Sequence, residues 1–146
     1  MRMSSQFTVS VQLLILIAIN KDQKVTSEMI SESTGGNPVM IRQLFGKLKS
    51  AGILNVSTGR GATSLARAAA DISLWDIYMA IEGYQAKDLF KFHPKISNGC
   101  QIGRFFQEIL EEHLDEAILA MAEKMSGVSL KQLIDEWQVA NNESEK

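Results

Sequence analysis

The apolar residues over positions 7–20 recur at the three- and four-residue spacing of a helix. The face defined by this spacing consists of Val11, Leu14, Ile15 and Ala18. Most other residues in this stretch are also apolar, which is typical of a helix covered on both sides. The pattern therefore predicts a first, buried helix over residues 7–20, with Thr8 as its N-cap.

A second, shorter helix is predicted over residues 28–34. Either Thr26 or Ser27 can cap its N-terminus with a hydroxyl oxygen. Glu28 follows at a position where the helix dipole favours a negative charge. Two successive glycines then end the helix.

A third helix is predicted to begin directly after these glycines. Asn37 is a strong N-cap, and Pro38 suits the first helical position because it lacks the N–H that would be unsatisfied there. We expect this helix to run to about Ser50, with Gly52 as its terminator.

The third helix has two faces of different chemistry. At 100° per residue its apolar stripe consists of Ile41, Leu44 and Leu48, which we expect to pack on the first two helices. The opposite stripe consists of Val39, Arg42, Gln43, Gly46 and Lys47. This second stripe is mostly polar, and we expect it to remain exposed.

A short β-hairpin follows the third helix. Residues 53–57 alternate as a strand does, Gly59-Arg60-Gly61 supplies a turn, and residues 64–66 return. The order of helix, turn, helix and hairpin is that of a winged helix-turn-helix domain.

The rest of the chain predicts three helices and a connector. Ser73 and Asp76 can form a reciprocal cap at the start of a helix that ends before Gly83. A long periodic helix follows over residues 101–125, and Ser129 caps a last helix that extends to about residue 139.

These elements predict a mainly α fold with a small β-wing, in which a winged helix-turn-helix domain carries a long C-terminal dimerisation helix. The expected division is a DNA-binding domain over 1–83, a connector over 84–100, dimerisation helices over 101–140 and a frayed tail over 141–146.

Charge is distributed unevenly along the chain, although its net value is only −2. Residues 1–67 contain eight basic and three acidic residues, a net charge of +5, whereas residues 68–146 contain seven and fourteen, a net charge of −7. A basic first half is typical of a surface that meets a polyanion. Chance segregation of charge is the alternative.

Composition excludes several classes of protein. A single cysteine rules out an internal disulfide framework and a multi-cysteine zinc finger. The longest apolar run near the start is shorter than the roughly 20 residues that span a bilayer, so we expect a cytoplasmic protein. Enzymatic activity has little support, because neither histidine, His93 or His113, has a nucleophilic partner at a recognisable spacing.

The exposed stripe of the third helix has the chemistry of a major-groove reader. Arg42 can form a bidentate contact with guanine, Gln43 with adenine, and an apolar side chain such as Val39 or Met40 can contact a thymine methyl. Lys47, one turn further on, suits a phosphate. The alternative is an ordinary solvated helix face.

Two further segments suit the DNA backbone. The N-terminus of the second helix, with Thr26 and Ser27, can bind a phosphate oxygen through its exposed amides. Arg60 at the tip of the hairpin can contact phosphate or enter the minor groove, unless it is simply a solvated residue of the turn.

At these residues the chain resembles the Rrf2 family of bacterial winged-helix transcriptional regulators, which includes an iron–sulfur cluster regulator, a nitric-oxide-sensing repressor and a cysteine-metabolism repressor. The resemblance rests on the segments TSEMISEST, NPVMIRQLFGKLKSAGIL, GRGATSLAR and ISLWDIYMAIEG, and on a cysteine before the long helix. It implies a DNA-contacting set of Asn37, Pro38, Val39, Met40, Arg42 and Gln43, with wing contacts at Thr58, Gly59, Arg60 and Gly61.

The chain departs from the family pattern in two ways. The wing often contains three successive glycines in the family, but here Ala62 and Thr63 follow Gly61. Cluster-binding members have three cysteines in the connector, whereas this chain has only Cys100. Because one thiolate cannot hold an iron–sulfur cluster, we expect no cluster and no metal.

The long helix is too apolar for a domain of this size to cover. A second copy of the chain would cover it, and an operator with two half-sites needs two reading heads. The predicted interface consists of Ile102, Phe106, Ile109, Leu110, Leu114, Ala117 and Met121. The alternative is burial against the chain's own helices near Trp75 and Trp137. His113 lies among acidic residues, and a solvated face is expected there rather than a metal site.

Cys100 is the one candidate for a redox or effector sensor. Near a helix N-terminus its pKa could fall and make the thiol reactive. A small buried residue is the alternative, and it is the one that we expect.

The sequence therefore predicts a dimeric, sequence-specific DNA-binding regulator that represses transcription by occupying a pseudo-palindromic operator. The competing prediction is a winged-helix module that binds protein and not DNA.

Overall fold

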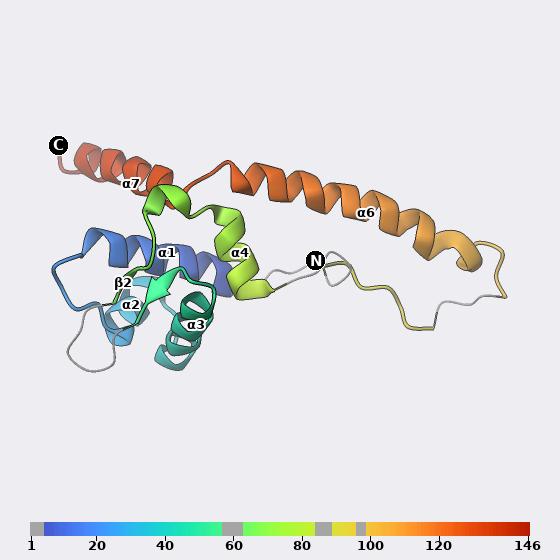
Figure 1. Ribbon diagram of the computed structural model, residues 1–146, viewed down its shortest axis with the longest axis horizontal. Coiled ribbons are helices and arrows are strands. Elements are labelled where there is room, and N and C mark those ends of the chain that lie inside the picture. The colour runs from blue at the N-terminus through green and yellow to red at the C-terminus, as the bar shows by residue number, and fades with distance from the viewer. Residues whose placement is uncertain (1–4, 57–62, 84–88, 96–98) are drawn as a thin grey trace.

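The computed structural model describes residues 5–56, 63–83, 89–95 and 99–146 of the 146-residue chain. Within these ranges the protein is mainly helical and contains one small antiparallel sheet (Figure 1). The elements are α1 (Ser5–Ile19), α2 (Ser27–Thr34), α3 (Pro38–Ser50), β1 (Leu54–Asn55), β2 (Ser64–Leu65), the 3-10 helix η1 (Ala69–Asp71), α4 (Leu74–Glu82), α6 (Gly103–Ser126) and α7 (Leu130–Ser144). This order confirms the predicted fold class.

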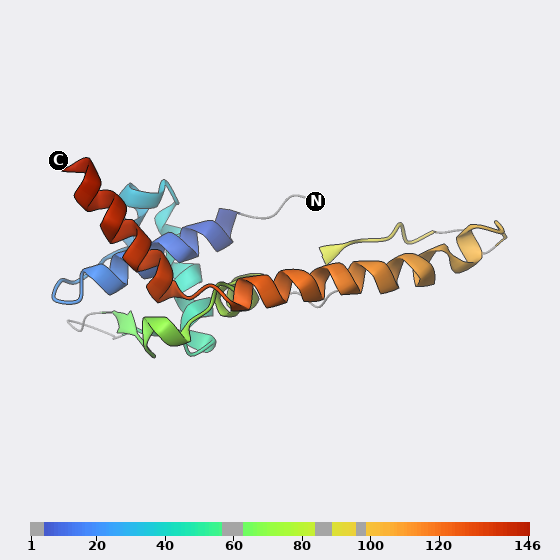
Figure 2. The ribbon, with the colours of Figure 1, turned by 90° about the horizontal axis from the view of Figure 1, so that it is seen from above.

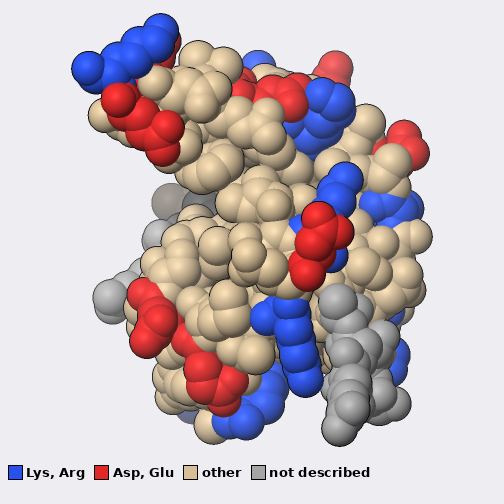
Figure 3. Space-filling view, turned by 90° about the vertical axis from the view of Figure 1, so that its left-hand side faces the viewer, with Lys and Arg blue, Asp and Glu red and all other residues tan. Residues whose placement is uncertain are grey.

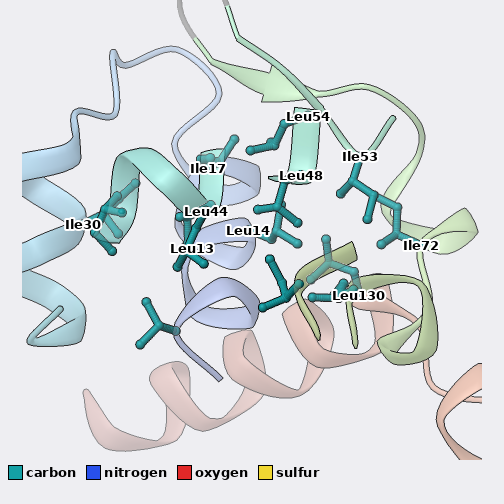
Figure 4. Packing of buried hydrophobic residues seen from close by; sticks show 14 of the residues in the cluster. Leu13, Leu14, Ile17, Ile30, Leu44, Leu48, Ile53, Leu54, Ile72 and Leu130 are labelled. Atoms are coloured by element: carbon teal, nitrogen blue, oxygen red, sulfur yellow. The ribbon is translucent and has the colours of Figure 1, made fainter. Parts of the chain in front are cut away.

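Helices α1, α2 and α3 share one apolar core (Figure 4). The predicted apolar stripe of α3, which consists of Ile41, Leu44 and Leu48, is fully buried in it. Leu13 and Leu14 of α1 lie in the same cluster. Burying a leucine side chain contributes about 1.5–3 kcal/mol, so this cluster fixes α3 with its opposite stripe outward.

Helix α1 begins earlier than predicted. The structure has Ser5 already in the helix, and the Thr8 hydroxyl donates to the Ser5 carbonyl oxygen at 3.0 Å. Thr8 is therefore inside the first turns and the prediction that it is the N-cap is wrong. A threonine hydroxyl can bond to a carbonyl three residues earlier as readily as it caps, so the residue type alone does not decide between the two.

The structure shows which side chains cap α2 and α3, and for α2 it decides between Thr26 and Ser27. The Oγ1 of Thr26 accepts from the Met29 amide at 3.2 Å, so Thr26 is the cap. Gly35 ends α2 in the left-handed region at φ 74°, where a glycine is favoured. Asn37 caps α3 as predicted, accepting at 2.8 Å from the Val39 amide.

The wing strands are shorter than predicted. Leu54 pairs with Leu65 and Asn55 with Ser64, and the Ala66 amide donates to the Ile53 carbonyl at 2.8 Å. The predicted turn at Thr58, Gly59, Arg60 and Gly61 lies outside the described residues.

Helix α6 is a 24-residue rod that projects away from the other helices (Figures 1 and 2). It contacts α4 near its C-terminal end, and none of its residues is buried. At about 1.5 Å per residue the rod is roughly 36 Å long. No helix in the described part of the chain is both long and apolar enough to cross a membrane.

Helix α7 packs on α1 and η1, although the predicted division grouped it with the long helix. Leu130 is fully buried beside Ile72, and its amide donates to the Ile72 carbonyl at 2.7 Å (Figure 4). The helical pattern located α7 correctly, but the sequence does not say which helices it contacts. Its first residue completes the core of the winged-helix domain.

The end of α7 also differs from the prediction. Ser129 is its N-cap, as predicted, and accepts from the Gln132 amide at 3.1 Å. The helix continues to Ser144, through most of the tail that we expected to fray. No glycine or proline follows residue 139 to stop it, so polarity alone was a poor predictor of its end.

Candidate nucleic-acid interface

The candidate interface is built on α2 and α3, which lie on the side of the domain opposite α6 and α7 (Figure 1). The outward face of α3 consists of Val39, Arg42, Gln43 and Gly46, and we call it the reading face. Every one of these residues is exposed, and Val39 is 57% exposed. The predicted polar stripe is therefore on the surface.

Arg42 and Gln43 are available to an external partner. Among the described residues, neither side chain donates or accepts a hydrogen bond. The positive charge of Arg42 contributes to a lowered pKa of the Glu28 carboxylate on α2. A guanidinium and an amide in this state can bind base edges without first losing an intramolecular bond.

Glu28 occupies the N-terminus of α2, where a phosphate was predicted. The pKa of Glu28 is lowered chiefly by its own backbone N–H, then by the Ser27 hydroxyl, and also by Arg42 and by Thr26. The Ser27 Oγ donates to Glu28 Oε2 at 3.1 Å. A phosphate bound here would meet this carboxylate, so the predicted contacts of Thr26 and Ser27 are opposed by a negative charge. The sequence already placed Glu28 in this first turn, but its proximity to Arg42 depends on the packing of α2 on α3.

Replacing Glu28 with glutamine is expected to tighten binding to duplex DNA of any sequence several-fold. The change removes a negative charge beside Arg42 and the α2 amides, while the Thr26 cap remains. Titration of a fluorescent duplex at two salt concentrations measures it. Glu32→Gln, an exposed residue one turn later on the same helix, is the control. Equal affinity of the wild type and Glu28→Gln would contradict a DNA surface at this end of α2.

Asn37, Pro38 and Met40 are less free than predicted. The Asn37 Oδ1 accepts from the amides of Val39 and Met40, which leaves only its side-chain N–H groups for DNA. Pro38 has no donor, and it and Met40 are half-buried. A Cβ on Gly36 would lie 2.8 Å from the Met40 Cε, so that side chain packs against the turn between α2 and α3.

Lys47 faces its own protein. Its Nζ donates to Gln6 Oε1 at 3.1 Å and to the Ile81 carbonyl at 3.1 Å. Ile81 lies in the last turn of α4, where the carbonyls carry a partial negative charge that attracts a cation. Two of the three N–H donors of Lys47 therefore fasten α3 to α1 and α4, and the exposed ammonium keeps one donor for the predicted phosphate contact.

Gly46 lies beneath open space. A Cβ built on Gly46 has no atom within 4 Å, so nothing in the described part of the chain requires a glycine there. A shallow groove of about 600 Å³ passes beside it between α3 and α4. A glycine costs about 1 kcal/mol relative to alanine inside a helix, which is a reason to look for an external group that approaches closely.

Replacing Gly46 with alanine is therefore expected to have two effects of opposite sign. Stability should rise by about 1 kcal/mol, because the helix is favoured and no clash arises. Affinity for DNA should fall, because the added methyl group occupies space that the sugar-phosphate backbone of the DNA would otherwise enter. Thermal unfolding and a binding titration on the same preparation measure both. Higher stability with unchanged DNA affinity would show that DNA does not approach here.

The apolar face of α6 is only partly covered, with the ring of Phe92 against that of Phe106. Ile102, Ile109 and Phe106 are 75%, 60% and 43% exposed, whereas Leu110, Leu114 and Met121 are half-buried and Ala117 is exposed. Phe105, which the predicted set omitted, is 54% exposed. The predicted alternative, burial against the chain's own helices near Trp75 and Trp137, does not describe this helix, because none of its residues is buried.

Cys100 precedes α6 and is exposed, so the expectation of a small buried residue is wrong. Backbone N–H groups of Gly103 and then Ile102 hold the pKa of its thiol below the usual value. Helix N-termini stabilise a thiolate in this way. The burial expected for a free cysteine is not seen because Cys100 lies just before the start of α6, a helix that projects away from the core (Figure 2).

Iodoacetamide labelling of Cys100 is expected to reach half of its maximal rate at a lower pH in the folded protein than in urea. The thiolate is the reactive form, so a lowered pKa moves the rate profile toward acid. Unfolding removes the two N–H donors and provides the control, and Cys100 is the only cysteine of the chain. The same midpoint in both states would show that the donors do not stabilise the thiolate.

The residues present do not fit an iron–sulfur cluster. Such clusters take several cysteine or histidine ligands, and the chain has one cysteine and two histidines. The described residues contain no group of three His, Cys, Asp or Glu side chains that could hold a metal ion.

Comparison with known proteins agrees with this geometry. The family model described as Rrf2, iron-dependent transcriptional regulator, matches residues 3–136. YwnA of Bacillus subtilis, whose name assigns it to the HTH-type transcriptional regulators, is 33% identical over 132 residues, which cover 90% of this chain and 96% of YwnA.

Two solved structures have the same fold. One, described as a DNA-binding protein, is 32% identical with a TM-score of 0.71 over 89% of this chain and 99% of its own. The other, CymR, the global cysteine regulator of B. subtilis, is 17% identical with a TM-score of 0.65 over 93% of this chain and 98% of its own. At that identity the likeness to CymR concerns the fold alone.

Proposed function

Because the chain belongs to the Rrf2 family of DNA-binding transcriptional regulators, we propose that it is a homodimer that reads a specific operator through α3 and represses transcription by occupying it. One observation carries this proposal. The apolar stripe of α3 is fully buried, and the opposite stripe presents Arg42 and Gln43 without hydrogen bonds to other described residues. Side chains that are held outward on a rigid helix are what base readout requires.

The residues of the interface take different parts in this proposal. Arg42 and Gln43 form hydrogen bonds with base edges, and Val39 contacts a thymine methyl. The side-chain N–H groups of Asn37 contact a phosphate at the start of α3. The wing contacts the flanking groove through Thr58, Gly59, Arg60 and Gly61, as the resemblance to the family implies. Thr26 and Ser27 contribute less than the sequence predicted, because the carboxylate of Glu28 repels a phosphate at this end of α2. Lys47 contacts a phosphate through its one remaining N–H donor.

A second copy of the chain covers α6 in this proposal. Ile102, Phe105 and Ile109 are each more than half exposed along one side of the rod, and large apolar faces of this kind mark protein contacts. Two copies related by a two-fold axis would present two reading faces, which suits a pseudo-palindromic operator. The rod also keeps the two domains apart, because it extends away from α1–α4 (Figure 2).

The protein would act on chromosomal DNA in the cytoplasm, without a cluster or another metal cofactor and without a catalytic activity. Cys100, exposed and with a lowered pKa, stays a prediction for a redox or effector sensor.

Selection from a random duplex pool tests the proposal. The protein is expected to enrich one motif with two-fold symmetry, and its affinity should fall as the salt concentration rises. Enrichment of no motif, together with weak and sequence-independent binding, would favour the alternative, a winged-helix module whose partner is another protein.

A further inference from the structure

A cavity of about 1020 Å³ lies outside the reading face, none of whose residues is among those that line it. Its walls come from the C-terminal end of α1, strand β2, the segment around η1 and one face of α7. Three consecutive alanines, at positions 68–70, line it and leave room that larger side chains would fill. Cavities that hold small ligands have volumes of about 300–1,000 Å³, so this one is large enough for a small molecule.

The cavity combines apolar walls with basic residues. Ile17, Leu65 and Ile134 are among its apolar residues, and Lys21, Arg67 and Lys131 are its cations. Figure 3 shows several separate Lys and Arg side chains on one face of the molecule, with Asp and Glu side chains between them.

The charges in the cavity do not cancel. Among the described residues that line it, Asp135 is the only carboxylate, and Lys131 pairs with it at 2.6 Å. Arg67 lies 3.7 Å from Asp76, which is outside the lining, and its side chain is 40% exposed. A guanidinium has five N–H donors, so Arg67 retains donors for another acid. Lys21 has no ion pair with a described residue. The cavity is therefore net positive.

We propose that this cavity binds a small organic anion with an apolar body. Its acid group pairs with Arg67 and Lys21, and its apolar part lies against Ile17, Leu65 and Ile134. The chemistry of the cavity favours this class over a neutral molecule, which would leave Lys21 without an ion pair and the remaining donors of Arg67 unused. It also disfavours a cation, which the positive lining would repel.

The position of the cavity connects this ligand to the wing. Ser64 and Leu65 of β2 line the cavity and also pair with Asn55 and Leu54 of β1. Helix α7, which forms the opposite wall, follows directly on α6 and is held by the bond between Leu130 and Ile72. A bound anion would contact a wing strand and neutralise basic residues near it. We therefore infer that the ligand lowers DNA affinity, and this step rests on the proposed function.

Calorimetry with decanoate, below its micellar concentration, tests the binding step. We expect one site per chain for decanoate. 1-Decanol has the same carbon chain without the charge, and we expect it to bind at least about tenfold more weakly. Arg67→Gln should remove the preference for decanoate over decanol, and Ala68→Phe should abolish binding by filling the cavity. Lys124→Gln, which removes a positive charge on α6, is the control and should bind decanoate as the wild type does.

Binding that survives both Arg67→Gln and Ala68→Phe would place decanoate elsewhere, for example on the apolar face of α6, and would overturn the proposal. The absence of decanoate binding to the wild type would overturn it too. For the second step, decanoate should weaken binding of the selected duplex to the wild type several-fold and leave Ala68→Phe unaffected. Unchanged DNA affinity in the presence of bound decanoate would overturn the coupling alone, whereas failure to bind DNA without decanoate would count against the proposed function instead.

Discussion

Replacing Arg42 with alanine is expected to weaken binding to the selected operator by about 1–3 kcal/mol per half-site, a factor of roughly five to 150 in Kd for each of the two half-sites. The reason is that a guanidinium on the reading face can form two hydrogen bonds with one guanine, which alanine cannot replace. Arg42 is exposed and has no hydrogen bond to a described residue, so the fold should be unaffected. Fluorescence anisotropy with the operator and with a scrambled duplex measures the loss and its dependence on sequence.

The control for this prediction is Lys124→Ala, which removes one positive charge from α6. It should lower affinity slightly and equally for both duplexes, because only the long-range attraction to phosphate changes. If Arg42→Ala behaves in the same way as this control, Arg42 supplies charge and not readout, and the proposed role of the residue is wrong.

Replacing Ile109 with glutamate is expected to give a monomer that has lost most operator binding. Ile109 is 60% exposed in the single chain, and in the proposed dimer it would be buried against the partner, where an unpaired carboxylate is costly. A monomer contacts only one half-site, so it loses the affinity that a dimer gains by binding both half-sites at once, a factor of about 100 or more. Sedimentation velocity measures the mass, and the operator titration measures the affinity.

Gln107→Glu is the matched control, since it adds the same charge two residues away on the polar side of α6. It should remain a dimer and retain the affinity of the wild type. A dimer in Ile109→Glu, or a wild-type protein that is monomeric and still binds the operator tightly, would contradict an assembly through this face.

Local signals in the sequence predicted the elements that position the reading face. Asn37 followed by Pro38 fixed the start of α3, and the spacing of Ile41, Leu44 and Leu48 fixed which side of it is buried. Such features depend on residues within one or two turns, so one chain suffices to recognise them. The exposure of Arg42 followed from them.

Tertiary contacts account for the differences. Lys47 has the spacing of an outward residue, but its long side chain reaches back to Ile81 on α4. Glu28 approaches Arg42 only because α2 packs on α3. Leu130 begins a helix that the sequence located, but its burial beside Ile72 depends on a contact between segments that lie 58 positions apart. Patterns of period two or 3.6 do not encode such contacts.

The central claim is that Arg42 reads a base. A double-mutant cycle tests it most directly, with the wild type and Arg42→Ala each titrated against the operator and against an operator in which one guanine per half-site is replaced by 7-deazaguanine, which lacks the N7 acceptor. We expect one guanine position at which the wild type loses affinity on this replacement and Arg42→Ala does not lose any further. Equal losses for both proteins at every guanine would contradict the claim.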